Sequence, residues 1–343
     1  MRILKSDTYI NEKLNISPVT KTRLSGFLKK PVIYDERIKD YIEWNELKWN
    51  PILGGYDCDG DITPDECIVS DGKLLIKFGH VKGNFDCDDF SLTTLEGAPR
   101  EVDGNFRCIG IMLTSLEGAP QKVGGDFDCS RNEQMATLEG APNEVGGNFH
   151  CEENNLTSLE GAPQKVGGDF DCIGNNLTTL KGAPNEVGGD FYCDNNNLAT
   201  LEGAPQKVGE NFTCCYNELT TLEGAPNEVS GEFECDNNEL TSLEGAPKKV
   251  GGGFSCSSNK LTTLEGAPQK VGKYFNCNTN QLTTLEGAPQ EVGGYFDCSS
   301  NNLTTLDGAP QKVGGDFYCI NNPNLALPKE RPSWVKGKYI TAL

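Results

Sequence analysis

The sequence predicts a repeat solenoid built mainly of β structure, on three observations. A 21-residue unit recurs along most of the chain, and one cysteine marks each copy at 21-residue intervals, except for 22 residues from Cys129 to Cys151. Each copy contains Phe-x-Cys, the alternation typical of a short strand whose Phe and Cys face one way. Each complete copy also contains Gly-Ala-Pro, which rules out a continuous helix. One coil cannot bury its apolar face alone, so stacked coils with parallel strands should form the core.

The two ends of the chain do not repeat and are predicted to cap this core. Residues 1–84 form an N-terminal cap region that includes a degenerate first coil, and residues 328–343 form a C-terminal cap with Trp334 and Tyr339 over the last coil. The stretch "DERIKDYIEWNELKW" predicts one short amphipathic helix in the N-terminal cap, because its apolar residues recur at helical spacing. These apolar residues are Ile38, Ile42 and Leu47.

An acidic stretch in the N-terminal cap, "YDCDGDITPDE", invites comparison with a calcium-binding loop. Asp57, Asp59 and Asp61 have the alternate spacing of such a loop, but Ile68 stands where its final Glu would be. The preceding "GGYDC" also looks like a damaged copy of the "GGYFDC" in the repeats. We therefore favour a degenerate first coil over a calcium site.

The repeating region is predicted to span residues 85–327 as about twelve coils. Its unit reads F-x-C-x-x-N-x-L-T-x-L-E-G-A-P-x-x-V-G-G-x. The Phe rings should stack as a ladder beneath the strands. One inward-facing thiol per coil is interpreted as a small apolar filler. The extra residue of the 22-residue interval lies within residues 130–137 and predicts a bulged loop there.

The polar positions of the unit also have structural interpretations. Asn stands at a predicted bend, where its amide can bond to backbone groups that the coil leaves unpaired. The Gly of Gly-Ala-Pro is expected at a positive φ or a close approach. Glu in most copies of the "LEG" step should form a solvated outer row. Lys and Glu alternate directly before Val, so neighbouring coils should place opposite charges side by side.

Nothing in the sequence indicates catalysis or metal binding. The chain has 15 cysteines without a Cys-x-x-Cys pair, and its two histidines are His80 and His150. The sequence also lacks a nucleophile–base pair and a phosphate-binding loop. We therefore expect no enzymatic activity, no metal and no cofactor.

The unit resembles leucine-rich repeats. "FDCIGNNL", residues 170–177, fits their L-x-L-x-x-N-x-L signature with Phe and Cys in place of two leucines, and "LTSLEGAPQKV" is similar to the short bacterial repeats of secreted effectors. The resemblance covers residues 85–327. It implies a parallel-strand arc with little helix on the convex side, which serves as a scaffold for recognition. Separately, residues 1–24 resemble the starts of uncharacterised proteins from T-even-type phages.

The resemblance implies that variable positions around Phe line a concave face. They combine acidic residues with tyrosines, which suit a protein interface. The predicted partner-binding residues are Asp86, Arg107, Asp128, His150, Asp171, Tyr192, Glu234, Tyr274, Tyr295, Asp297 and Tyr318. The alternative is that these positions vary without selection on a solvated sheet.

Charge narrows the class of partner. The net charge is −20, with +3 in the first 50 residues and −23 in the rest. An acidic body repels nucleic acid and suits a basic protein surface. The sequence lacks a signal peptide and any run of 18 apolar residues, and its many thiols suit a reducing compartment, so we expect a cytoplasmic protein and no membrane partner.

These observations predict a non-enzymatic protein-interaction module. The phage resemblance favours an inhibitor of a host or anti-phage defence protein, acting in the bacterial host cytoplasm. The alternative is a structural role, as a virion component or an assembly spacer whose length matters more than its face. The sequence does not define the oligomeric state.

Overall fold

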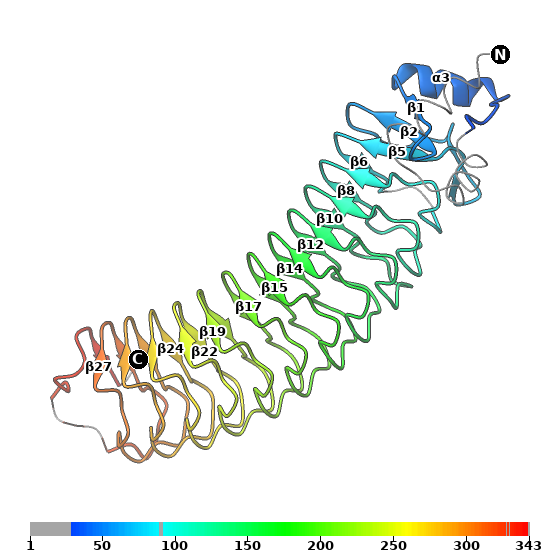
Figure 1. Ribbon diagram of the computed structural model, residues 1–343. Coiled ribbons are helices and arrows are strands. Elements are labelled where there is room, and N and C mark those ends of the chain that lie inside the picture. The colour runs from blue at the N-terminus through cyan, green and yellow to red at the C-terminus, as the bar shows by residue number, and fades with distance from the viewer. Residues whose placement is uncertain (1–28, 89–91, 327, 329, 342–343) are drawn as a thin grey trace, which may run out of the picture.

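The computed structural model describes residues 29–88, 92–326, 328 and 330–341. It is an elongated arc of stacked coils (Figure 1), with strands along the inner edge and irregular loops along the outer edge. The described part contains one α-helix, which lies at the N-terminal end. The predicted fold class, a parallel-strand solenoid with little helix, is confirmed. The phage-like segment, residues 1–24, lies outside the described residues.

The coils pair through two sheets, where the sequence predicted one. A 14-stranded sheet runs through the Val positions, and we call it the Val ladder; a 13-stranded sheet runs through the Phe positions, and we call it the Phe ladder. Each repeat coil gives a two-residue strand to each ladder. Neighbouring coils pair in parallel, and the antiparallel pair β1–β2 starts the Val ladder.

The Val ladder consists of β1 (Lys48–Asn50), β2 (Gly55–Cys58), β5 (Phe78–Val81), β7 (Glu101–Val102), β9 (Lys122–Val123), β11 (Glu144–Val145), β13 (Lys165–Val166), β15 (Glu186–Val187), β17 (Lys207–Val208), β19 (Glu228–Val229), β21 (Lys249–Val250), β23 (Lys270–Val271), β25 (Glu291–Val292) and β27 (Lys312–Val313). The Phe ladder consists of β6 (Phe85–Asp86), β8 (Phe106–Arg107), β10 (Phe127–Asp128), β12 (Phe149–His150), β14 (Phe170–Asp171), β16 (Phe191–Tyr192), β18 (Phe212–Thr213), β20 (Phe233–Glu234), β22 (Phe254–Ser255), β24 (Phe275–Asn276), β26 (Phe296–Asp297), β28 (Phe317–Tyr318) and β29 (Tyr339–Ile340). A small hairpin, β3 (Val69–Ser70) and β4 (Lys73–Leu74), lies outside both ladders.

Aromatic rings and thiols fill the core beneath the Phe ladder, as predicted. From Phe85 to Phe317 the successive rings are stacked, with centroids 5.2–5.5 Å apart. All 15 cysteines are free thiols, and the cysteine of each Phe-x-Cys is buried. Each repeat thiol donates to a backbone carbonyl of the next coil, for example from Cys172 Sγ to the Tyr192 oxygen at 3.1 Å.

The Asn column confirms the predicted role in backbone bonding. Asn196 Nδ2 lies 3.1–3.2 Å from the carbonyl oxygens of Cys172, Cys193 and Asp194, and its Oδ1 accepts from the Leu177 nitrogen at 3.0 Å. The amide thus ties each coil to the preceding one. The Gly of Gly-Ala-Pro has a φ between +81° and +100° in every copy, as expected.

The longer interval between Cys129 and Cys151 leaves the core register intact. Phe127 still pairs with Phe149, and the extra residue sits in a turn after Asn132. Met135 then occupies the buried position that Leu holds in the other coils. The predicted bulged loop is present.

Opposite charges face each other along most of the Val ladder, as the alternation predicted, although Lys249 and Lys270 place like charges on neighbouring coils. Lys249 Nζ lies 2.5 Å from Glu228 Oε1, and Lys270 Nζ lies 3.4 Å from Glu291 Oε2. These side chains are largely exposed, so each pair contributes at most about 1 kcal/mol.

The predicted helix is α3 (Glu36–Trp44), with Asp35 as its N-cap. Ile38 and Tyr41 are buried against the first coils, and Leu47 is buried just beyond the helix. The helix therefore packs at the N-terminal end of the core.

The first coil is degenerate, but the sequence-based register was wrong. Cys58 pairs with Val81 in the Val ladder instead of continuing the cysteine column, and Ile62 bridges to Phe85 at the start of the Phe ladder. The matching segment is therefore Cys58–Ile62, a copy of Val-x-Gly-x-Phe. The similarity between "GGYDC" and "GGYFDC" was misleading. Tyr56 and Cys58 belong to the Val ladder, whereas the Phe and Cys of "GGYFDC" belong to the Phe ladder.

This register gives the three aspartates structural roles. Asp57 Oδ1 accepts from the His80 nitrogen at 2.8 Å, and Asp61 Oδ1 accepts from the Asn84 nitrogen at 2.7 Å. Asp59 lies between the ammonium groups of Lys48 and Lys82, each at 2.7 Å, and hydrogen bonds from these lysines lower its pKa to about 2. All three carboxylates thus have protein partners.

The C-terminal cap contains a further partial coil that was not predicted from the sequence. Val335 bridges to Val313, and Tyr339 pairs with Phe317. The segment "VKGKYIT" is thus a divergent copy of Val-Gly-Gly-x-Phe-x-Cys. The Trp334 ring packs edge-on against Phe317, the last Phe of the stack, with ring centroids 5.1 Å apart.

Candidate functional site on the concave face

Three columns of side chains cover the concave face, because they alternate with the buried Phe and Cys. The pre-Phe column is Asn84, Asn105, Asp126, Asn148, Asp169, Asp190, Asn211, Glu232, Gly253, Tyr274, Tyr295 and Asp316. The post-Phe column is Asp86, Arg107, Asp128, His150, Asp171, Tyr192, Thr213, Glu234, Ser255, Asn276, Asp297 and Tyr318. The post-Cys column is Asp88, Ile109, Ser130, Glu152, Ile173, Asp194, Cys215, Asp236, Ser257, Asn278, Ser299 and Ile320. The third column was not predicted from the sequence, although the alternation of Phe-x-Cys continues into it.

Most of the pre-Phe column has a structural function. Asp169 Oδ1 accepts from the Asp190 nitrogen at 2.8 Å, and Asp190 Oδ1 accepts from the Asn211 nitrogen at 2.7 Å. The same bond recurs between successive coils from Asp61 to Glu232. The side chain of each coil thus bonds to the backbone of the next, which explains why Asn and Asp dominate this column.

The charges at the N-terminal end of the face are partly neutralised by Arg107. Arg107 Nη2 lies 2.9 Å from Asp88 Oδ2, and Arg107 Nε lies 3.8 Å from Asp86 Oδ2. Asp128 Oδ1 accepts from the nitrogen and the hydroxyl of Ser130, at 3.1 and 2.7 Å. Asp86, Arg107 and Asp128 therefore use part of their charge and hydrogen-bonding capacity in contacts within the face.

The middle of the face gathers a histidine and carboxylates. His150 and Asp171 are register partners in β12 and β14, and Glu152 lies two residues after His150 on the same face. Burial raises the pKa of the Glu152 carboxyl and that of Asp171. In the next coils Asp194 is half-buried, and burial raises its pKa too. Desolvated acids are thus concentrated here.

The C-terminal part of the face carries an aromatic cluster, Tyr274, Tyr295 and Tyr318. The first two rings are stacked at 5.1 Å, and Tyr295 meets Tyr318 edge-on at 6.1 Å. Tyr295 is 38% exposed, so its ring is available to a partner. We call these three residues the tyrosine cluster.

Two carboxylates and one glycine hold the tyrosine cluster in place. The Tyr274 hydroxyl lies 3.0 Å from Glu232 Oε2 and 2.9 Å from Glu234 Oε1, two coils away. Its ring crosses Gly253, where a Cβ would lie 2.2 Å from the ring atoms. Gly253 therefore permits Tyr274 to lie flat along the face. Burial raises the pKa of Glu234, so this carboxylate is costly to keep charged.

The remaining predicted residues are separate from the tyrosine cluster or at its edge. The Tyr192 hydroxyl donates to Asp190, four coils before the Tyr274 coil. Asp297 Oδ1 accepts from the Ser299 nitrogen at 2.9 Å, beside Tyr295. The structure thus divides the eleven predicted residues into an N-terminal, a central and a C-terminal group along one face. Eight coils separate Arg107 from the Tyr274 coil, roughly 40 Å at the strand spacing.

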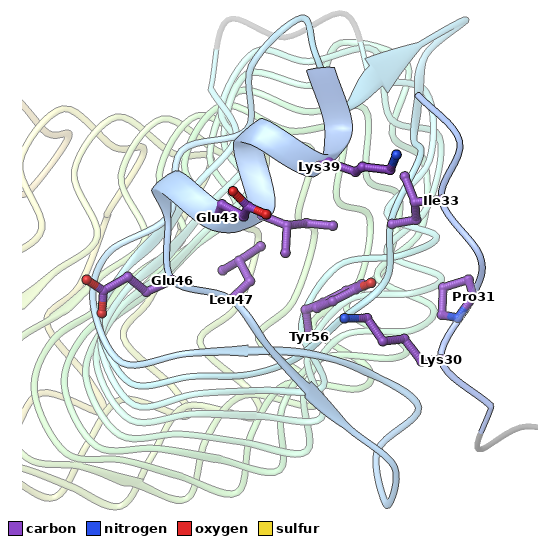
Figure 2. A pocket seen from close by; sticks show the side chains of 9 residues that line it. Lys30, Pro31, Ile33, Lys39, Glu43, Glu46, Leu47 and Tyr56 are labelled. Atoms are coloured by element: carbon purple, nitrogen blue, oxygen red, sulfur yellow. The ribbon is translucent and has the colours of Figure 1, made fainter. Parts of the chain in front are cut away.

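A cavity of about 520 Å³ lies away from this face, between α3 and residues 30–33. Figure 2 shows the Tyr56 ring at its base with the Lys30 side chain beside it. Lys39 and Glu43 line it from the helix, so the lining mixes both charges. The Lys30 ammonium lies 5.7 Å from the centre of the Tyr56 ring, an interaction that fastens residues 30–33 to the first coil.

The coil geometry defines the fold. A 21-residue unit places a strand on the concave face, and an Asn after the strand bonds to the backbone of its own and the preceding coil. The chain is a leucine-rich-repeat-like solenoid.

Among solved structures, YopM from Yersinia enterocolitica WA-314 aligns with 78% of this chain and 73% of its own length, at 16% identity and a TM-score of 0.37. No protein-family model matches the sequence, and a search of curated proteins gave no match. No helix in the described residues is long and apolar enough to cross a bilayer.

Proposed function

We propose that this protein is a non-enzymatic interaction module whose concave face binds the basic surface of another protein. The tyrosine cluster carries the proposal, because it combines exposed aromatic area with adjacent carboxylates. Lysine or arginine side chains of a partner can stack on the Tyr295 ring and pair with Asp297. The charge of −23 beyond residue 50 would steer such a partner to the face.

The setting of the proposal is a bacterial cytoplasm. The resemblance of residues 1–24 to phage proteins supports a host or defence protein as the partner, and inhibition of that protein as the outcome. The free thiols of the repeats support a reducing compartment. Nucleic acid is an unsuitable ligand for the acidic columns.

The experiment starts with capture of partners from a bacterial lysate and continues with the purified partner. Tyr295→Ala should weaken its association at least about tenfold, because an aromatic anchor at the centre of an interface contributes strongly. The control is Tyr216→Ala, since Tyr216 is 59% exposed and lies outside the tyrosine cluster. This control should bind like the wild type.

Two double variants test whether the position of the acidic residues, and not only the total charge of the chain, determines association with the partner. Asp128→Lys with Asp297→Lys changes charge on the concave face, and Glu202→Lys with Glu223→Lys makes the same change in the outer row. The concave pair should reduce association more than the outer pair. Equal losses would mean that net charge alone attracts the partner. Failure to capture any partner, with the chain recovered in purified phage particles, would replace the proposal by the structural role.

A further inference from the structure

Three side chains at the centre of the concave face converge as a ligand set. His150 and Asp171 are opposite each other on neighbouring strands, and Glu152 projects from the same face of the coil as His150. One donor atom from each residue lies within 4.8 Å of the other two. His150 Nδ1 is 3.8 Å from Glu152 Oε2. The set thus combines one imidazole nitrogen with two carboxylate oxygens.

Glu152 is the member of this set whose carboxylate has an unpartnered buried oxygen. Its Oε2 atom is removed from solvent and has no hydrogen-bond partner in the described structure. Elsewhere on the face the buried carboxylate oxygens accept from backbone nitrogens, as Asp194 Oδ1 does from Cys215 at 2.6 Å. A desolvated, unpartnered carboxylate is costly unless a proton or a cation lies beside it.

We propose that His150, Glu152 and Asp171 bind a zinc-class divalent cation, with its fourth coordination position open to the concave face. Zinc accepts nitrogen and oxygen ligands at about 2.0–2.2 Å in tetrahedral geometry, which places ligand atoms roughly 3.5 Å apart. The donor atoms lie within 4.8 Å of one another, so binding would require only side-chain rotations of these partly exposed residues to reach that spacing. Magnesium and calcium suit the site less, because they prefer more ligands, all of them oxygen.

The open position distinguishes this site from a closed structural one. Three protein ligands leave room for water or for a donor group of a bound molecule. The cation would also neutralise two carboxylates that burial otherwise penalises. This inference stands independently of the proposed protein partner, because it concerns the isolated chain and the metal alone.

The test is titration of the reduced, metal-free full chain with Zn²⁺ in a calorimeter, followed by Co²⁺ as a spectroscopic substitute. The wild type should show one saturable site. Asp171→Asn retains the acceptor for the Ile173 nitrogen, so the fold should persist, yet Zn²⁺ affinity should fall at least about tenfold. His150→Ala should cause a similar loss.

The matched control is His80→Ala, because His80 is the other histidine and contacts one carboxylate, Asp103, at 2.9 Å. This variant should bind Zn²⁺ like the wild type, and circular dichroism should show that all variants are folded. Absence of saturable binding to the wild type would overturn the proposal. Unchanged affinity in both His150→Ala and Asp171→Asn would also overturn it, as would a thiolate-to-cobalt charge-transfer band, which would assign the metal to cysteines.

Discussion

At the residue scale, one amide per coil satisfies several backbone groups that would otherwise be buried without partners. Asn196 is 6% exposed and bonds to three carbonyl oxygens and one backbone nitrogen. The sequence predicted this role because an amide that recurs at the same bend in most coils can serve the backbone groups exposed there. The sequence did not predict the hydrogen bonds from the pre-Phe side chains to the backbone of the next coil. Asn and Asp both occupy that column, so no single residue type recurs there.

Asn196→Asp tests this role with almost no change in shape. The carboxylate loses both donors and faces three carbonyl oxygens, so the free energy of unfolding at neutral pH should fall by at least about 3 kcal/mol. Asn197→Asp, one residue later on an exposed side chain, should change it by less than about 0.5 kcal/mol. Urea unfolding of both variants gives the comparison.

The difference between these two variants should shrink in acid. Burial disfavours the charged form and raises the pKa of the new carboxyl in the folded state. Its penalty is therefore present at neutral pH and is relieved as the pH falls through that raised value, because the protonated group regains a donor. A constant difference from neutral to acid pH would contradict the role assigned to Asn196.

The Phe column gives a second test of single residues. Phe212 is fully buried between Phe191 and Phe233, with ring centroids at 5.3 and 5.4 Å. Phe212→Ala should lower the free energy of unfolding by about 3–5 kcal/mol, because it opens a cavity in a continuous stack. Tyr216→Ala serves as the exposed control. A loss below about 1 kcal/mol would show that the stack relaxes around the gap.

At the scale of the element, each coil is a pair of short strands that differ in how well the sequence predicts them. The Phe strand was predicted because Phe-x-Cys alternates. The Val strand was missed because Gly-Gly follows Val and erases any alternation. The divergent last coil was missed for a related reason: "VKGKYIT" keeps the spacing of Val and the aromatic residue, but Tyr339 and Thr341 replace Phe and Cys.

The cysteine column predicts a pattern of chemical reactivity. The repeat thiols are buried, and burial raises their pKa, for example that of Cys172. Cys67 and Cys215 are only partly buried, although burial raises their pKa as well. Iodoacetamide on the native protein should therefore modify these two alone, and slowly, because the thiolate is the reactive form.

Peptide mass spectrometry of the alkylated protein provides the measurement. Urea-unfolded chain should react at all 15 cysteines, which controls for reagent and pH. Rapid native modification of Cys172 or Cys214 would show that the coils open locally. Such opening would be incompatible with the stacked core described above.

At the scale of the whole molecule, the net charge and the Lys–Glu pairing along the Val ladder were predictable, but the clustering of charged groups on the concave face was not. The sequence carries a net charge of −20 and an alternation of Lys and Glu, and register pairing places those opposite charges together. The central group of His150, Glu152 and Asp171 was harder to foresee. The repeat register already placed His150 beside Asp171. The missing signal was Glu152, because the post-Cys column that contains it was not recognised as part of the face.

The dependence of the melting temperature on salt should show whether Lys–Glu attraction or repulsion between like charges has the larger effect on stability. The ion pairs of the Val ladder are largely exposed, and each contributes at most about 1 kcal/mol. Against them stands a net charge of −20 on stacked coils, whose like charges lie within the screening length of about 8–10 Å. Repulsion between like charges should outweigh the Lys–Glu ion pairs, so adding NaCl to about 0.3 M should raise the melting temperature by a few degrees.

Glu223→Gln with Glu244→Gln removes two outer charges that have no ion-pair partner in the described structure. This variant should melt higher than the wild type at low salt and gain less from added NaCl. A melting temperature that falls with salt would show instead that the Lys–Glu pairs along the Val ladder hold the arc together.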